Sequence, residues 1–149
     1  MRKNYKLKRT ISMKQFISEF GESFSGHMKE RLLELEVRCV LTRKEEENKL
    51  DLKHVEHTKY DSKEYAYGQL IANEGELYFS EKCMEGPDVM ENPVVDPIYN
   101  ALKTEEVVIN ENIKAKKVDD SNIDYIIDNI LEVCPQVTDR YLEIMSKYL

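Results

Sequence analysis

The chain has 149 residues and a mass of 17.6 kDa, which predicts one domain over 1–149 with one hydrophobic core. Hydrophobic residues make up 41% and charged residues 34%, so the composition excludes a disordered chain and a membrane protein. The net charge of −7 favours a basic partner over nucleic acid. The three cysteines, Cys39, Cys83 and Cys134, are too widely spaced to form a zinc motif, and they fit a reduced, cytoplasmic protein.

The first nine residues include five basic residues and no acidic residue, whereas the rest of the chain has an excess of acidic residues. We expect a flexible arm over 1–10 that keeps the chain soluble. The alternative is a weak contact with nucleic-acid phosphates through the basic side chains of this arm. These side chains are Arg2, Lys3, Lys6, Lys8 and Arg9.

Residues 12–30 are predicted to form an amphipathic helix, because apolar residues recur there at helical spacing and Ser12 can cap the first turn. From 33 to 42 apolar and polar residues alternate, which predicts a strand with one buried face. The charged segment 44–49 interrupts this alternation, which resumes at Leu50. We therefore expect an antiparallel hairpin in which 33–42 pairs with 49–58.

Residues 61–73 fit two interpretations. As a helix, the segment buries Tyr65, Leu70 and Ile71 and ends near Gly75. As a strand, it places tyrosine and glycine at alternate positions, and a three-residue loop, Asn73-Glu74-Gly75, joins it to a further strand. The strand is favoured by the tyrosine content and would extend the sheet to a four-stranded meander through 64–82.

The C-terminal part is predicted to be mainly helical. Asp96 and Pro97 begin a helix that runs to about Thr104, and 107–109 is extended. The polar residues 119–121 precede a helix with a wide isoleucine face that ends at Pro135, and a last helix covers about 138–147. The predicted fold class is α+β, with an N-terminal helix, an antiparallel hairpin or meander, and C-terminal helices packed on it.

No motif for catalysis or ligand binding is found. His54 and His57 are three residues apart on a predicted strand and therefore face opposite ways, which argues against a metal site. The sequence contains neither a nucleophile elbow nor a phosphate-binding loop. The acidic residues Glu45–Glu47 fit a solvated turn between two strands. Asp119-Asp120 fit the start of a helix, where negative charge is favourable. We therefore predict no catalytic residue, no cofactor and no metal, and a protein that is not an enzyme.

The aromatic residues around the central stretch allow two interpretations. They can be half-buried core, or they can form a contact surface for another protein, since tyrosine offers a large area with a polar tip. The candidate partner-binding residues are Tyr65, Tyr67, Tyr78, Phe79 and Tyr99.

The central stretch resembles the Panacea domain, a family of phage-associated and toxin-neutralising proteins that includes the SocA-like proteolytic adaptor. The motifs that carry the resemblance, over about 60–145, are Ala66-Tyr67-Gly68, Leu70-Ile71-Ala72, Gly75, Tyr78-Phe79-Ser80-Glu81 and Pro93-Val94-Val95-Asp96-Pro97-Ile98-Tyr99, followed by the late helix from Val118. The resemblance implies structural roles for Gly68, Gly75, Pro93, Val94 and Val95. It also implies an alternative fold, a mostly helical bundle with a short hairpin.

The function implied by the resemblance is that of a non-catalytic protein-binding module. It would neutralise a partner protein, as an antitoxin or proteolytic adaptor acting on a small, basic toxin, in a one-to-one or two-to-two complex. The alternative is a phage or mobile-element accessory regulator, which touches nucleic acid through the basic arm while the body self-associates as a homodimer.

Overall fold

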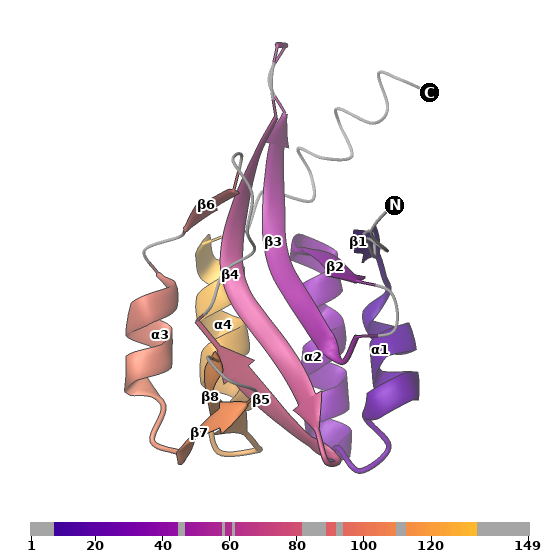
Figure 1. The fold of residues 1–149 in the computed structure, drawn as a ribbon, viewed down its shortest axis with the longest axis vertical. Helices are drawn as coiled ribbons and strands as arrows, with labels where there is room; N and C mark the ends of the chain where they lie inside the picture. Colours follow the sequence, from indigo (N-terminus) through magenta and orange to yellow (C-terminus); the bar gives the residue numbers. More distant parts are fainter. Residues whose placement is uncertain are drawn as a thin grey trace, which may run out of the picture.

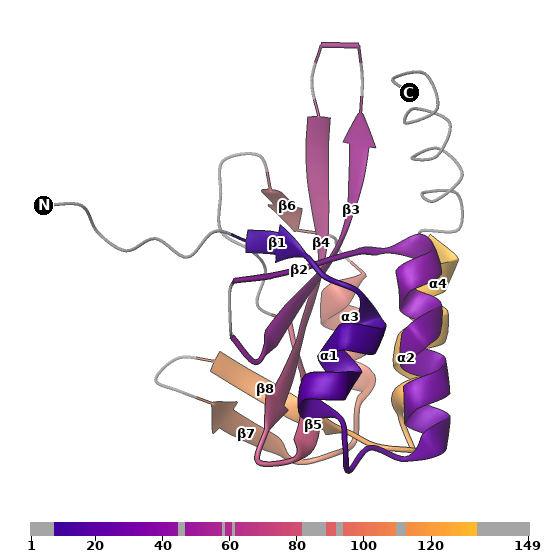
Figure 2. The same cartoon turned by 90° about the vertical axis from the view of Figure 1, so that its right-hand side faces the viewer.

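The computed structural model describes residues 8–44, 47–57, 59–60, 62–81, 89–91, 94–109 and 113–133. These residues form an α+β fold in which four helices cover one face of an eight-stranded sheet (Figures 1 and 2). The elements in chain order are β1 Lys8–Thr10, α1 Met13–Phe20, α2 Gly26–Arg38, β2 Val40–Lys44, β3 Lys49–His57, β4 Ser62–Asn73, β5 Glu76–Ser80, β6 Val89–Glu91, α3 Val95–Ala101, β7 Glu106–Ile109, β8 Ile113–Val118 and α4 Ile123–Val133.

The sheet has the strand order β1-β2-β3-β4-β5-β8-β7, and all of these neighbours are antiparallel. The short strand β6 lies beside β4 in parallel. The predicted α+β class and the predicted meander, β2 to β5, are therefore confirmed. The alternative of a mostly helical bundle is wrong.

The N-terminal part differs from the prediction in two ways. The expected helix over 12–30 is two helices, because the chain turns at Gly21, where a Cβ atom would lie 2.8 Å from the Phe24 ring. The expected strand from 33 is wrong up to Arg38, since α2 continues to that residue and β2 begins at Val40. The helix is stabilised there because Leu32 and Leu35 both lie in the core.

The expected flexible arm over 1–10 is also wrong at its end. Lys8–Thr10 form β1, which pairs with β2 and places Lys8 opposite Lys44 and Arg9 opposite Arg43. Arg2, Lys3 and Lys6 lie outside the described residues.

The strand interpretation of 61–73 is confirmed, and β4 carries a bulge in its middle. Its register with β3 shifts between the pairs Asp51–Gln69 and Lys53–Ala66, so Leu52 faces two residues of β4. Gly68 is one of them, with a φ of 98°. A Cβ atom at this position would lie 2.6 Å from the carbonyl oxygen of Ser80, so glycine is required.

The turn between β4 and β5 is shorter than predicted. Asn73 pairs with Glu76, which leaves a loop of two residues, Glu74 and Gly75, in place of three. Both take positive φ, of 53° and 80°, as in the tight turns whose twist matches that of a hairpin. Glycine at position 75 accommodates this left-handed conformation without strain.

The C-terminal part follows the prediction for α3, β7 and α4, although α3 ends at Ala101, before the expected Thr104. The strand β8 was not predicted, because three of its six residues are lysines. At the start of α4, the Asn122 side-chain oxygen accepts a hydrogen bond from the Asp119 backbone N–H at 2.9 Å. Pro135 and the helix expected over 138–147 lie outside the described residues.

The main core lies between the helices and the sheet. It is formed by residues from all four helices and from the helix-facing side of β2, β3, β4, β5 and β8. A second, smaller core lies on the opposite face, where Ile71, Ile109, Ile113 and Ala115 pack together. In the described part of the chain, no helix has the length and apolar character needed to span a membrane.

The bulge at Gly68 generates the first prediction. Gly68→Ala combines an unfavourable φ with a clash against β5, so we expect a loss of about 3 kcal/mol in the free energy of unfolding. Gly26→Ala is the control, because Gly26 lies in the first turn of α2 with no atom within 4 Å of a new Cβ. It should be neutral or stabilising by up to about 1 kcal/mol. Urea unfolding followed by circular dichroism measures both, and equal stability of the two variants would contradict the assigned role of the bulge.

Candidate protein-binding surface

For three of the five candidate partner-binding residues the structure supports the core interpretation over the contact surface. Tyr67 and Phe79 are completely buried and Tyr99 is nearly so, while Tyr65 and Tyr78 are half-buried. Tyr67 and Phe79 belong to the helix-facing side of β4 and β5, and Tyr99 faces the same core from α3. Three of the five rings are therefore part of the core and are not available to a partner.

The family-motif residues have structural positions. Gly68 forms the bulge and Gly75 the turn, Val94 precedes α3 and is half-buried, and Val95 is buried in the first turn of α3. Pro93 lies outside the described residues. The motif residues that the structure describes therefore serve backbone geometry and the packing of α3.

The feature that stands out from the body is a two-stranded arm. We define the arm as His54–His57 of β3, Ser62–Tyr65 of β4 and the connecting residues Lys59 and Tyr60. β2 pairs with β3 only as far as Lys53, and the ribbon continues beyond this point, away from the helices (Figures 1 and 2). Along the arm the two strands pair with each other, and β6 adds backbone pairs to β4 from Glu64 to Ala66.

Tyr60 at the end of the arm is exposed over 88% of its surface, more than any other large hydrophobic residue in the described part of the chain. The Lys59 ammonium group lies 5.5 Å from the centre of its ring, within range of a cation–π interaction. An aromatic ring held in water at the end of a projecting ribbon is typical of an anchor residue for a protein partner.

The base of the arm is held by a buried His–Tyr pair. The Tyr67 hydroxyl group is hydrogen-bonded to Nδ1 of His54, and both residues are buried. The His54 ring lies 4.7 Å from the Tyr65 ring and 5.3 Å from the Tyr67 ring, measured between centroids. His54 therefore packs between two tyrosine rings at the base of the arm. In the described residues, no group of three or more His, Cys, Asp and Glu side chains is placed to hold a metal ion.

A second polar cluster joins α3 to β7 and β8. The Tyr99 hydroxyl donates to the Glu106 carboxylate at 2.6 Å, and the Lys116 ammonium donates to the backbone oxygens of Tyr99 and Leu102, both at 3.1 Å. The same ammonium lies 4.7 Å from the centre of the Tyr99 ring. Lys116 thereby satisfies carbonyl groups at the end of α3, and Glu106 fixes the edge strand β7 to that helix.

Ion pairs join the outer sides of α2 and α4. His27 contacts the two carboxylate oxygens of Asp124 at 2.9 and 3.0 Å, and Arg31 pairs with both Asp124 and Asp128. The Ser25 hydroxyl donates to Asp120 at 2.6 Å. Asp120 thus helps to hold the start of α4 against the start of α2.

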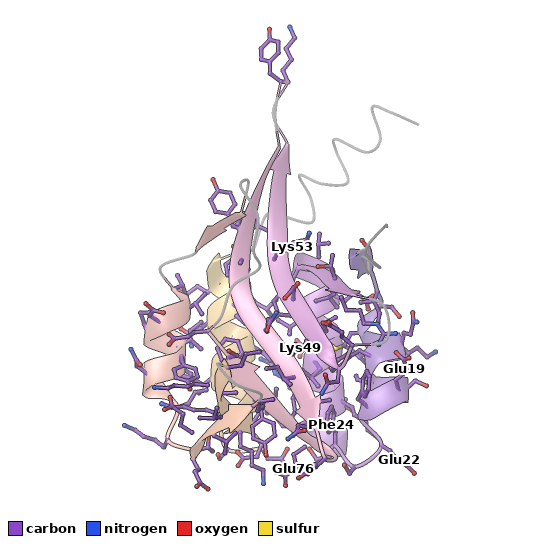
Figure 3. The ribbon with its side chains drawn as sticks, viewed as in Figure 1. Glu19, Glu22, Phe24, Lys49, Lys53 and Glu76 are labelled. Carbon is purple, nitrogen blue, oxygen red and sulfur yellow. The ribbon has the colours of Figure 1, made fainter. Side chains whose placement is uncertain are left out.

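A polar row, buried except for the half-buried Gln69, crosses the helix-free face and was not predicted. Backbone pairing aligns Thr42, Asp51, Gln69 and Ser80 across β2, β3, β4 and β5, and the Gln69 amide donates to Asp51 at 2.6 Å. Lys49 and Lys53 lie on β3 on either side of Asp51 (Figure 3). Among the described residues neither the Gln69 side-chain oxygen nor the Thr42 hydroxyl has a hydrogen-bond partner. Ordered water commonly satisfies polar atoms of this kind.

Comparison with known proteins adds no identification. No family model, no curated protein and no solved structure matches the chain, so the resemblance to the Panacea domain stays a prediction.

The environment of Tyr99 generates the second prediction. Burial raises the pKa of its hydroxyl far above the usual value, and the hydrogen bond to Glu106 raises this pKa further. Because the pKa is raised in the folded state, the neutral phenol contributes stability below about pH 10, and this contribution is lost as the pH rises above that value.

We therefore expect the free energy of unfolding to fall between about pH 10 and 12, and to fall less steeply for Tyr99→Phe. At neutral pH this variant should lose about 1 kcal/mol, because the hydrogen bond to Glu106 is gone. Tyr60→Phe, which changes an exposed ring, is the matched control and should behave as the unmodified protein. Urea unfolding at a series of pH values measures both effects, and identical pH slopes for all three proteins would contradict the assignment.

Proposed function

We propose that this chain is a non-catalytic protein-binding module that neutralises a partner protein, and that the β3–β4 arm makes the contact. The partner class that fits best is a small, basic toxin, with the chain acting as its antitoxin or as a proteolytic adaptor. The observation that supports this most directly is the projecting arm with Tyr60 exposed at its end.

The burial of the other aromatic residues strengthens the case for the arm. Of the described tyrosines, Tyr67 and Tyr99 are buried, Tyr65 and Tyr78 are half-buried, and Tyr125 on α4 is 43% exposed. Tyr60 is the described tyrosine with the largest apolar area left to bury in a complex. Truncation of a central aromatic anchor of this kind typically costs a complex 2 kcal/mol or more.

Charge supports a basic partner. The net charge is −7, so the molecule as a whole carries an excess of negative charge. An acidic surface raises the rate at which a basic protein is encountered, while the arm would supply the short-range contact. The proposal places the protein in the cytoplasm, where the buried thiol of Cys39 would remain reduced.

The experiment is co-expression with the product of the neighbouring gene, followed by a growth assay and purification of the complex. We expect rescue of growth and a stable complex. Tyr60→Ala should weaken the complex about 30-fold, equivalent to about 2 kcal/mol, without changing the unfolding transition.

Tyr125→Ala is the matched control, because it removes an exposed tyrosine from α4, away from the arm. It should leave the affinity unchanged in isothermal titration calorimetry. Absence of both rescue and complex would overturn the proposed function. A complex that Tyr60→Ala leaves intact would overturn the role of the arm.

A further inference from the structure

The two ends of the sheet differ in how their open edges are protected. β1 at one end contains Lys8 and Arg9, and charged residues on an edge strand oppose pairing with another chain. β7 at the other end has the sequence Glu-Val-Val-Ile, and among the described strands only β8 pairs with it. Val108 in its centre is exposed over 64% of its surface. An apolar edge strand of this kind is a template for adding a further strand.

The surrounding structure holds β7 in a defined position. Its register with β8 pairs Val107 with Ala115 and Ile109 with Ile113, and these side chains belong to the small core on the helix-free face. On the helix side, Glu106 accepts the hydrogen bond from Tyr99. The charge of Glu106, which is also exposed, is thus engaged within its own copy, and Val108 is the exposed apolar side chain of the strand.

We propose that two copies of this chain associate by antiparallel pairing of their β7 strands across a two-fold axis perpendicular to the sheet. Such an axis keeps the helix layers of both copies on the same side, so residues directly opposite each other must face the same side of the sheet. The registers that overlap most of the four-residue strand place the axis through a pair of Val108 residues or through a pair of Val107 residues.

Only the register centred on Val108 is complementary. It places Val108 opposite Val108 of the second copy on the helix side, and Val107 opposite Ile109 on the other side, so that every described pair is apolar. β-branched pairs of this type stabilise a sheet. The register centred on Val107 would instead place Glu106 opposite Val108, and a charge against an apolar side chain would destabilise the pairing.

The size of the edge sets the strength of the association. β7 has four residues, so the contact is shorter than those of obligate dimers, and we expect a dissociation constant in the micromolar range. The dimer is independent of the proposed toxin contact, because the arm lies at the other end of the molecule (Figure 1).

Sedimentation-velocity centrifugation of the full chain from about 1 to about 300 µM tests the dimer. We expect a concentration-dependent shift from monomer to dimer. Val108→Lys places two like charges directly opposite each other and should weaken the dimer at least tenfold. Val37→Lys is the matched control, because Val37 is also an exposed valine, 57% exposed, but lies on α2. It should leave the dimer unchanged.

A crosslinking experiment provides a second measurement that does not depend on the stability of the lysine variant. Val108→Cys brings two thiols opposite each other and should form a covalent dimer under mild oxidation, whereas Val37→Cys should not. A chain that stays monomeric over the whole concentration range would overturn the proposal. So would a dimer that persists in Val108→Lys, or equal crosslinking of the two cysteine variants.

Discussion

The sheet depends on β4, which pairs with β3 from Ser62 to Ile71 and with two different strands along its other edge. The bulge at Gly68 separates these two halves: beyond it β4 pairs with β5, and before it with β6. A residue with a Cβ atom cannot occupy this position, because β5 passes too closely. The left-handed conformation of one glycine therefore allows one half of β4 to belong to the body of the sheet and the other half to the arm.

Burial of the aromatic residues follows from the same arrangement. All four helices lie on one face of the sheet, so the side chains that β4 and β5 direct to that face become core. Burial of a side chain such as Phe79 or Tyr67 contributes about 2 to 3 kcal/mol, and the Tyr67 hydroxyl keeps a partner in His54. The rings thus stabilise the fold, and the proposed contact with a partner would use residues beyond the reach of the helices.

The sequence predicted this fold where one periodicity dominates. Alternation of tyrosine and glycine correctly assigned β4, and the isoleucine spacing correctly assigned α4. The prediction failed at 33–38, where Leu33, Leu35 and Val37 alternate as in a strand, although Leu32 and Leu35 are the residues that reach the core. It failed at β8 because lysines mask the alternation of Ile113 and Ala115. Local patterns do not reveal which neighbours will cover a segment.

The candidate site was harder to predict than the fold for a related reason. Alternation along a strand divides its residues between two faces, but the bulge at Gly68 breaks the alternation in β4. Which face the helices cover is a tertiary property. Tyr60 could have been recognised, because it lies in the polar segment between two alternating stretches, where a hairpin tip exposes its residues. Val108 could not, since its exposure depends on β7 being the last strand in the sheet order, and this order depends on the unpredicted β8.

The two proposed contacts are compatible because they use opposite ends of the molecule. The arm projects from one end of the body, and β7 lies at the other (Figure 1). A two-fold dimer through β7 extends the sheet of one copy into that of the other and leaves both arms free to bind. Each dimer would then bind two partner molecules without contact between them, and dimerisation would raise avidity only for a partner that is itself multivalent. For a monomeric partner the affinity of the arm would be the same in monomer and dimer, so the two associations can be measured separately.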